Sequence, residues 1–204
     1  MTTICNASLF RTAARFVSTD PSRYYIGGVF VCPHPETGVY VVATDGAAML
    51  IAHDPKGVVS GKPPIIKLPA HMLKACGPDR NGVEKQLIIS DDGTAVLMLQ
   101  ETPEMTVPGV LVDGTYPAWE RVAKPTVGEF APEEFSFAEV KRFGDAAKEL
   151  GVKSFWAFGE KQNAAVIRFQ GRNDVYGVLS PFRHKDNAPL DLTIPSFFQG
   201  VKYD

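Results

Sequence analysis

The sequence predicts an α+β protein built from three repeats, each a short strand, a helix and three further strands. Three observations lead to this prediction. β-Branched and aromatic residues gather in short runs bounded by turn residues, which is typical of antiparallel strands. Apolar residues with helical spacing lie between some of these runs. The same order of elements recurs along the chain, which indicates repeated structural units.

The first repeat runs from about Thr2 to Asp54. We expect a short strand, a helix over about Ala7 to Ser18, and strands in RYYIGGVFVC, VYVVATD and AAMLIAH. One side of the helix is apolar, whereas Arg11 and Arg15 lie four residues apart on another side. These arginines form either a basic functional face or an ordinary solvated one.

The second repeat runs from about Pro64 to Val112, with strands in IIKL, QLIIS, AVLMLQ and MTVPGVLV. Pro69 and Gly77 mark the start and end of a short helix, because proline suits the first turn and glycine suits the position after the last. Asp91-Asp92-Gly93 predicts a tight hairpin turn.

A loop rich in Pro, Gly and Thr from about Ala123 to Pro132 predicts a boundary before the third repeat. We expect a strand around Phe135, a helix to about Leu150, and strands in SFWAFG, AAVIRFQ and VYGVLS. Ser136 and Glu139 have the spacing of a capping box. The remaining helix positions predict a buried stripe of Phe137, Val140, Ala147 and Leu150, and an exposed face with Lys141 and Lys148.

The composition limits the function. The 204 residues are 45% hydrophobic and carry a formal net charge of -2, so DNA contact would need a local basic patch. Cys5, Cys32 and Cys76 are far apart and lack CxxC spacing, which predicts reduced thiols. With no signal-peptide pattern and no long apolar run in the sequence, we expect a cytoplasmic globular protein.

Enzymatic motifs are missing from the sequence. The histidines, of which His34 lies nearest a cysteine, show no HExxH or CxxC pattern, and neither a phosphate-binding glycine loop nor GxSxG occurs. Asp45 and Asp113, each followed by glycine, are typical of turns and have no paired base or acid. We therefore predict no metal, no cofactor, no catalytic residue and no enzymatic activity.

Several segments together resemble one family. RYYIGGVFV, VYVVATDGAAML and LVDGTYPAWERV resemble the middle domain of the bacterial DNA polymerase III beta subunit, the sliding clamp. EFSFAEVKRFGDAAKELGVKSFWAF and YGVLSPFR resemble the second half of its last domain. The resemblance covers roughly Thr2 to Arg183, and the family's first domain has no counterpart in it.

The resemblance implies a DNA-clamp fold with helices on one side, facing DNA, and antiparallel sheets on the other. It divides the chain into a complete clamp-like domain (1–122), a linker (123–132), a half clamp domain (133–183) and a C-terminal tail (184–204). A half domain leaves an unpaired sheet edge, so we expect a homo-oligomer. The number of subunits stays open.

The resemblance also implies two sets of functional residues. The set facing double-stranded DNA is Arg11, Arg15, Arg23, Tyr24, Tyr25, Lys74, Lys141 and Lys148. The set forming a peptide-binding pocket is Ile26, Thr44, Gly46, Met49, Pro117, Arg121, Val122, Val178, Leu179, Pro181, Phe182 and Arg183. Ala47, Ala48, Trp119 and Ser180 depart from the family pattern, so the pocket is reshaped.

The function expected from the resemblance is a replication processivity factor, of bacterial or phage origin, that self-assembles around DNA and binds partner peptides. The alternative is a clamp-derived peptide-binding module that does not encircle DNA. Pro189-Leu190-Asp191-Leu192 in the tail loosely resembles a clamp-binding peptide. The tail therefore either docks in the pocket of its own or a neighbouring chain, or adds a strand or wraps over the surface.

Overall fold

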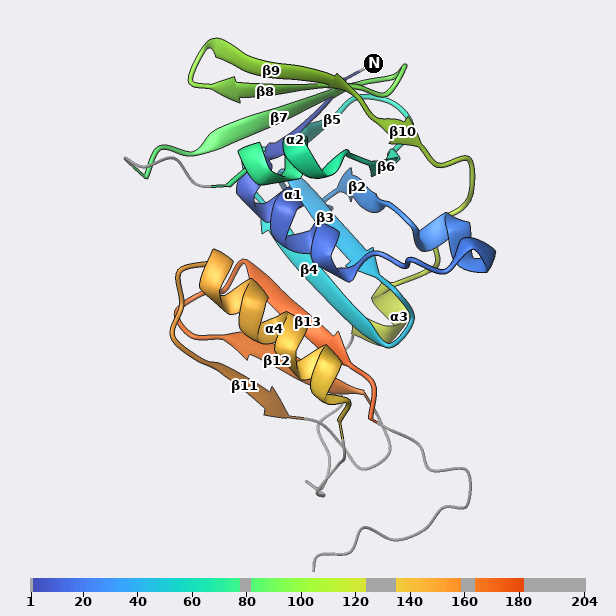
Figure 1. Ribbon diagram of the computed structural model, residues 1–204, viewed down its shortest axis with the longest axis vertical. Coiled ribbons are helices and arrows are strands. Elements are labelled where there is room, and N and C mark those ends of the chain that lie inside the picture. The colour runs from blue at the N-terminus through green and yellow to red at the C-terminus, as the bar shows by residue number, and fades with distance from the viewer. Residues whose placement is uncertain (1, 78–81, 124–134, 159–163, 182–204) are drawn as a thin grey trace, which may run out of the picture.

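A computed structural model describes residues 2–77, 82–123, 135–158 and 164–181. These residues form two antiparallel sheets with three helices, α1, α2 and α4, on one side (Figure 1). The predicted α+β class, with antiparallel sheets and helices on one side, is confirmed. Within these ranges no helix is both long and apolar enough to cross a membrane.

The first unit opens with a strand that leads directly into a capped helix. The side-chain oxygen of Asn6 accepts the amides of Ser8 and Leu9 at 2.9 and 3.2 Å, which satisfies two free donors of the helix N-terminus. The elements are β1 (Thr2–Asn6), α1 (Ala7–Ala13), a 3-10 turn η1 (Ala14–Phe16), β2 (Val29–Pro33), β3 (Val39–Thr44) and β4 (Ala48–Asp54).

The second unit repeats this order. Its elements are β6 (Ile65–Lys67), α2 (Ala70–Ala75), β7 (Lys85–Ser90), β8 (Thr94–Leu99) and β9 (Thr102–Pro108), with short strands β5 (Val58–Val59) and β10 (Val110–Leu111) before and after it. Gly93 has a φ of 87° in the β7–β8 turn, a conformation that glycine adopts without strain. The single strand predicted over 105–112 is divided at Gly109, whose amide donates to the Gly93 carbonyl at 2.9 Å.

The first two units exchange strands. β1 of the first unit pairs with β7 of the second, from Thr2 opposite Ser90 to Asn6 opposite Gln86. β6 of the second unit pairs with β2 of the first. Because each unit completes the other's sheet, neither can pair its strands fully alone.

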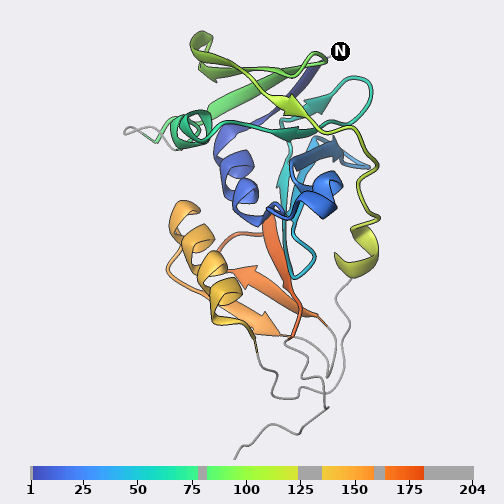
Figure 2. The ribbon, with the colours of Figure 1, turned by 45° about the vertical axis from the view of Figure 1, so that its right-hand side comes forward.

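The third unit extends the sheet of the first. It contains α4 (Phe137–Glu149), β11 (Phe155–Phe158), β12 (Ala165–Phe169) and β13 (Val175–Leu179). β13 pairs with β4 from Val175 opposite Ala52 to Leu179 opposite Ala48. The resulting eight-stranded sheet has the order β10-β6-β2-β3-β4-β13-β12-β11. Figure 2 shows α4 on one side of this sheet and the short helix α3 (Glu120–Ala123) on the other.

Of two predicted strands, the one over 23–32 forms only from Val29 onward as β2, and the one around Phe135 lies partly outside the described residues. Arg23 to Ile26 lie in a 3-10 helix, η2 (Pro21–Ile26), which starts with proline and is capped by Asp20. Phe135 and Ser136 have no regular structure, and the residues before them lie outside the described ranges. The equivalent strand of the second unit, β6, needs β2 of its sister unit as a partner. No described segment offers such a partner to the third unit.

The start of α4 also differs from the prediction. The Ser136 side chain makes no capping bond, and Glu139 instead accepts from Arg142 at 2.6 Å. Phe137 is 83% exposed rather than buried, whereas Ala147 is buried as predicted and Val140 and Leu150 are partly buried. The capping box and the burial of Phe137 are therefore corrected, because the described residues place no neighbouring unit over this end of the helix.

One apolar core runs under the helices of all three units. It joins Phe10 of α1, Met72 of α2, Phe143 of α4 and Phe169 of β12, each at most 2% exposed. A smaller core lies on the opposite face of the large sheet and contains buried residues of all three units together with α3 and the chain before it: Ile26, Cys32, Val42, Met49, Ile51, Ile65, Tyr116, Trp119, Ala123 and Val178.

Gly177 allows α4 to approach the sheet closely. A Cβ at this position would overlap the ring of Phe143, so we expect Gly177→Ala to destabilise the protein by about 1–3 kcal/mol through overpacking. Gly144, inside α4, has nothing within 4 Å of an added Cβ. Gly144→Ala should therefore stabilise by about 0.5–1 kcal/mol through helix propensity. Urea denaturation measures the free energy of unfolding of both variants. Equal changes for the two substitutions would contradict the close packing of α4 on Gly177.

Candidate functional site

A groove lies where the third unit joins the first, on the sheet face opposite α1 and α4. Its cavity has a volume of about 260 Å³. The floor comes from both units, because Met49 of β4 and Val178 of β13 are register partners across the joint. The lining residues are Arg23, Tyr25, Ile26, Thr44, Gly46, Ala47, Ala48, Met49, Pro117, Ala118, Trp119, Val122, Ala164, Val178 and Ser180.

The chain around α3 forms an apolar wall of the groove. Trp119 is 5% exposed, and its ring meets that of Tyr40 edge to face at 5.1 Å. Val122, by contrast, is 54% exposed and lines the cavity. The wall therefore combines a rigid aromatic anchor with an apolar side chain open to a ligand.

The turn between β3 and β4 forms the polar rim. One carboxylate oxygen of Asp45 accepts the amides of Ala47 and Ala48, each at 2.9 Å. Gly46 has a φ of 93°, which fits this tight turn. The guanidinium of Arg23 donates to the Asp45 carbonyl at 3.1 Å and thereby lies at the rim. Asp45 thus serves the turn, as its sequence context predicted.

Arg142 of α4 links this turn to the first helix. Its Nη1 donates to Asp45 and to Glu139, and its Nε and Nη2 donate to the Arg15 carbonyl at 3.2 and 3.0 Å. Its guanidinium also lies 4.9 Å from the centre of the Phe16 ring. One side chain therefore holds the third unit against both the helix and the groove rim of the first.

The environment of Asp45 stabilises its charged form. Burial acts to raise its pKa, but the Ala48 amide, the Arg142 guanidinium and the Ala47 amide together outweigh burial, and the pKa is lowered. The Asp45–Arg142 ion pair is therefore formed at neutral pH.

Most of the residues predicted for the peptide pocket line this one cavity, namely Ile26, Thr44, Gly46, Met49, Pro117, Val122 and Val178. Arg121 is exposed on α3 and Pro181 is partly buried, but neither lines the cavity. Leu179 is buried in the main core beneath α4, because alternation along β13 turns it away from Val178. Phe182 and Arg183 lie outside the described residues.

The cavity also includes residues for which the sequence suggested other roles. Arg23 and Tyr25, placed with the DNA-facing set, line the groove, and Tyr24 beside them is 59% exposed. Ala164 was not singled out at all. The sequence gives no signal for Ala164, because it reaches the groove only through the pairing of β12, which it precedes, with β13.

The predicted DNA-facing cations lie on the helices, where acids of α4 neutralise several of them. Glu149 binds Arg11 at 3.0 Å and Arg15 at 2.6 Å. Asp145 binds Lys141 at 2.7 Å and lies 3.9 Å from Lys148. Lys74 lies in the last turn of α2. The helix side therefore carries compensated charge rather than a strong basic patch.

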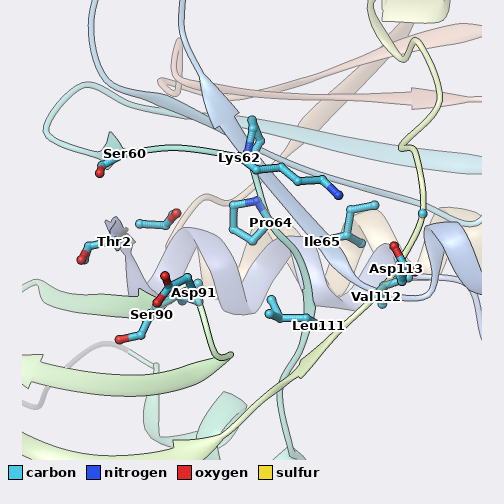
Figure 3. A pocket seen from close by; sticks show the side chains of 14 residues that line it. Thr2, Ser60, Lys62, Pro64, Ile65, Ser90, Asp91, Leu111, Val112 and Asp113 are labelled. Atoms are coloured by element: carbon cyan, nitrogen blue, oxygen red, sulfur yellow. The ribbon is translucent and has the colours of Figure 1, made fainter.

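A second cavity of about 270 Å³ lies between the two sheets near the start of β1 (Figure 3). Lys62 and Pro64 come from the chain before β6, and Ser90, Asp91 and Leu111 from the facing segments (Figure 3). Its lining comes from the first two units and the short segments that follow them. The groove, in contrast, draws on the first and third units and the chain between the second and third units.

Burial suppresses the reactivity of the three cysteines. Burial raises the pKa of all three thiols, that of Cys32 to about 12 and that of Cys76 to about 11. The thiols are therefore protonated at neutral pH and weak as nucleophiles. In the described part of the chain, no group of three or more His, Cys, Asp or Glu residues could hold a metal ion.

No family model and no curated protein matches the chain. Many solved structures do, and they include bacterial sliding clamps (DNA polymerase III subunit beta). The clamp of Bartonella birtlesii bound to griselimycin has a TM-score of 0.61 and 17% identity over 90% of this chain and 66% of its own. The clamp of Borrelia burgdorferi in complex with a natural product has a TM-score of 0.64 and 11% identity, over 90% and 64%.

The Pseudomonas aeruginosa clamp with ligand gives a TM-score of 0.63 and 14% identity, over 90% of this chain and 66% of its own. At such identities the similarity establishes the fold. This chain spans about two thirds of the length of these clamps, so it has a shortened version of the sliding-clamp fold.

The ion pair at the groove rim gives a pH-dependent prediction. Because the pKa of Asp45 is lowered in the folded protein, its contribution is fully present above the ordinary carboxyl value and is lost as the pH falls through the lowered pKa. Asp45→Asn keeps an acceptor for the amides but removes the charge. We expect the substitution to lower the free energy of unfolding by about 1–2 kcal/mol at neutral pH, a value between those of exposed and buried ion pairs.

Urea denaturation of the wild-type protein and Asp45→Asn across acid pH measures this contribution. The difference in the free energy of unfolding should shrink toward zero as Asp45 becomes protonated in the wild-type protein. A difference that stays constant from neutral to acid pH would show that the charge of Asp45 does not stabilise the joint.

Proposed function

We propose that this chain is a shortened sliding-clamp-like processivity factor of DNA replication, which self-assembles around double-stranded DNA and binds partner peptides in the groove. The observation that carries the proposal is the convergence of most predicted pocket residues on one cavity within a clamp fold. We assign 1–122 to a complete clamp domain, 123–132 to a linker, 133–183 to a half domain and 184–204 to a tail.

The groove suits a short extended peptide. Its floor and wall are apolar, with Met49, Val178 and Trp119 available to anchor one or two aliphatic or aromatic side chains. Arg23 at the rim can pair with an acidic side chain or a peptide carbonyl. Ala47 and Ala48 are small where the sliding-clamp resemblance implies larger polar residues, so this rim leaves more room for the peptide.

The helix side suits loose contact with DNA. Compensated cations such as Arg11, Arg15 and Lys141 form few strong phosphate contacts while their acidic partners stay in place. A protein that holds DNA by encirclement needs few such contacts, since strong phosphate binding would slow its movement and increase its salt dependence. The proposed site of action is the cytoplasm of a bacterial cell, with a bacterial or phage origin.

The second candidate is a clamp-derived peptide-binding module that does not encircle DNA. The paired charges of the helix side favour it, because they leave little attraction for DNA phosphates. A chain of this kind that does not close into a ring would not stay on DNA. Both candidates use the groove for peptides and neither requires catalysis. They differ in whether DNA passes through an oligomer.

Peptide binding in the groove is tested with two exposed valines. Val122 is 54% exposed and lines the cavity, whereas Val110 is 63% exposed on β10, outside it. The probe is a synthetic peptide containing Gln-Leu-Asp-Leu-Phe, a complete form of the clamp-binding pattern that the tail loosely resembles. We expect Val122→Lys to weaken binding about tenfold by placing a charge in the apolar wall, with no change for Val110→Lys.

Isothermal titration calorimetry with both variants gives the dissociation constants. Binding that Val122→Lys and Val110→Lys reduce equally would place the peptide elsewhere on the surface. Failure of the wild-type protein to bind this peptide would contradict the proposed use of the groove for standard clamp partners.

A further inference from the structure

The two sheets end in four edge strands, β5 and β9 in one sheet and β10 and β11 in the other. An edge strand presents unpaired N–H and C=O groups, and proteins protect such edges against unwanted pairing. Short length, proline and charge are the usual protective devices. The four edges differ sharply in these devices.

Three of the edges are protected. β5 and β10 contain only two residues each. β9 is longer, but it contains Pro103, Glu104 and Pro108. β11, with the sequence FWAF over Phe155–Phe158, has neither a proline nor a charge. β9 and β11 lie at opposite ends of the molecule (Figure 1), so protection of one does not extend to the other.

The backbone of β11 can accept another strand. The Gln170 amide donates to the Ser154 carbonyl at 3.1 Å, which sets the alternation of the ladder between β11 and β12. The N–H of Trp156 therefore points toward β12, and those of Phe155 and Ala157 point to the outer edge. Among the described residues, no strand pairs with this outer edge.

The second unit shows how the same strand looks when it is covered. β7 and β11 correspond, because each is the first strand after the helix of its unit. The outer edge of β7 is paired with β1 of the first unit. Leu87 and Ile89 of β7 are 0% and 1% exposed beneath that cover. Among the described residues β11 has no equivalent cover, and Ala157 is exposed while Phe155 is only partly buried.

Two large aromatic side chains of the third unit are exposed, one on β11 and one at the start of α4. Phe155 faces α4, with its ring 6.3 Å from that of Phe143, so alternation puts Trp156 on the other face of the sheet. Trp156 is 56% exposed, and Phe137 in the first turn of α4 is 83% exposed. Exposed aromatic residues beside an open edge are typical of a protein interface.

We propose that the β11 edge, with Trp156 and Phe137, is the interface with the third unit of a second copy of this chain, related by a two-fold axis. Each of the first two units has the other as a neighbour that completes its sheet, and a second copy supplies such a neighbour to the third unit. A two-fold axis follows because both copies have the same uncovered surface. The interface deepens the proposed self-assembly and rests on that proposed function.

Sedimentation velocity of the full chain over a wide concentration range tests the interface. The wild-type protein should dimerise reversibly. Trp156→Lys places a charge beside the edge, and Ala157→Pro removes an outward N–H while sparing the bond to β12. Each should weaken dimerisation by about tenfold or more. Val110→Lys, at the opposite end of the same sheet, is the control and should dimerise like the wild-type protein.

Acrylamide quenching of tryptophan fluorescence gives an independent readout, because Trp119 is buried and Trp156 is exposed in the single chain. Quenching should fall as the dimer forms. A monomer at every concentration would overturn the interface, as would a dimer unchanged by both Trp156→Lys and Ala157→Pro. A monomer whose Trp156 is already protected would identify the chain's own remaining residues as the cover, which also overturns it.

Failure of this interface can be distinguished from failure of the proposed function. A monomeric protein that still binds the Gln-Leu-Asp-Leu-Phe peptide through Val122 would overturn the interface and leave peptide binding in the groove standing. A dimer that binds no peptide would overturn peptide binding in the groove and leave the interface standing.

Discussion

The pairing of β4 with β13 is the contact on which the rest of the structure depends. It continues the sheet of the first unit into the third, so that one core runs beneath α1 and α4. On the other face it sets Met49 opposite Val178 and thereby makes the groove floor. The groove therefore exists only while the third unit stays docked, so the proposed peptide binding depends on the stability of docking.

Apolar burial carries most of this docking. Phe143 is fully buried against Phe16, with ring centres 4.9 Å apart, and each such side chain contributes about 1.5–3 kcal/mol through burial. The partly exposed ion pairs of Arg142 and Glu149 contribute less, about 0–1 kcal/mol where they are open to solvent. Their main effects are to orient the units and to reduce the positive charge of the helix side.

The sequence was most informative where local pattern and tertiary structure agree. Short apolar runs bounded by turn residues predicted β3 and β4, and the Asp45-Gly46 pair predicted the turn that becomes the groove rim. Predictions failed where a distant partner decides the outcome. The helical spacing of Phe137 could not show that the described residues leave it uncovered. The strand prediction at Arg23 to Ile26, in contrast, failed for a local reason, because Pro21 starts a 3-10 helix there despite the strand-like residue types.

The placement of the charges was equally beyond a single sequence. Arg11 and Arg15 have helical spacing, but their acidic partner Glu149 is distant along the chain. A partial signal was present, since Asp145 and Glu149 lie four residues apart on α4 beside Lys141 and Lys148. Arg23 and Tyr25 reach the groove through η2 and not through the strand that their residue types suggested.

Topological retention on DNA is the most direct test of a clamp. The purified protein would be loaded on nicked circular DNA and passed through a gel-filtration column at a salt concentration that suppresses phosphate contacts, before and after the circle is cut. We expect co-elution with the intact circle and release from the linear form. Equal retention on both forms, or retention on neither, would contradict encirclement and favour the non-encircling peptide-binding module.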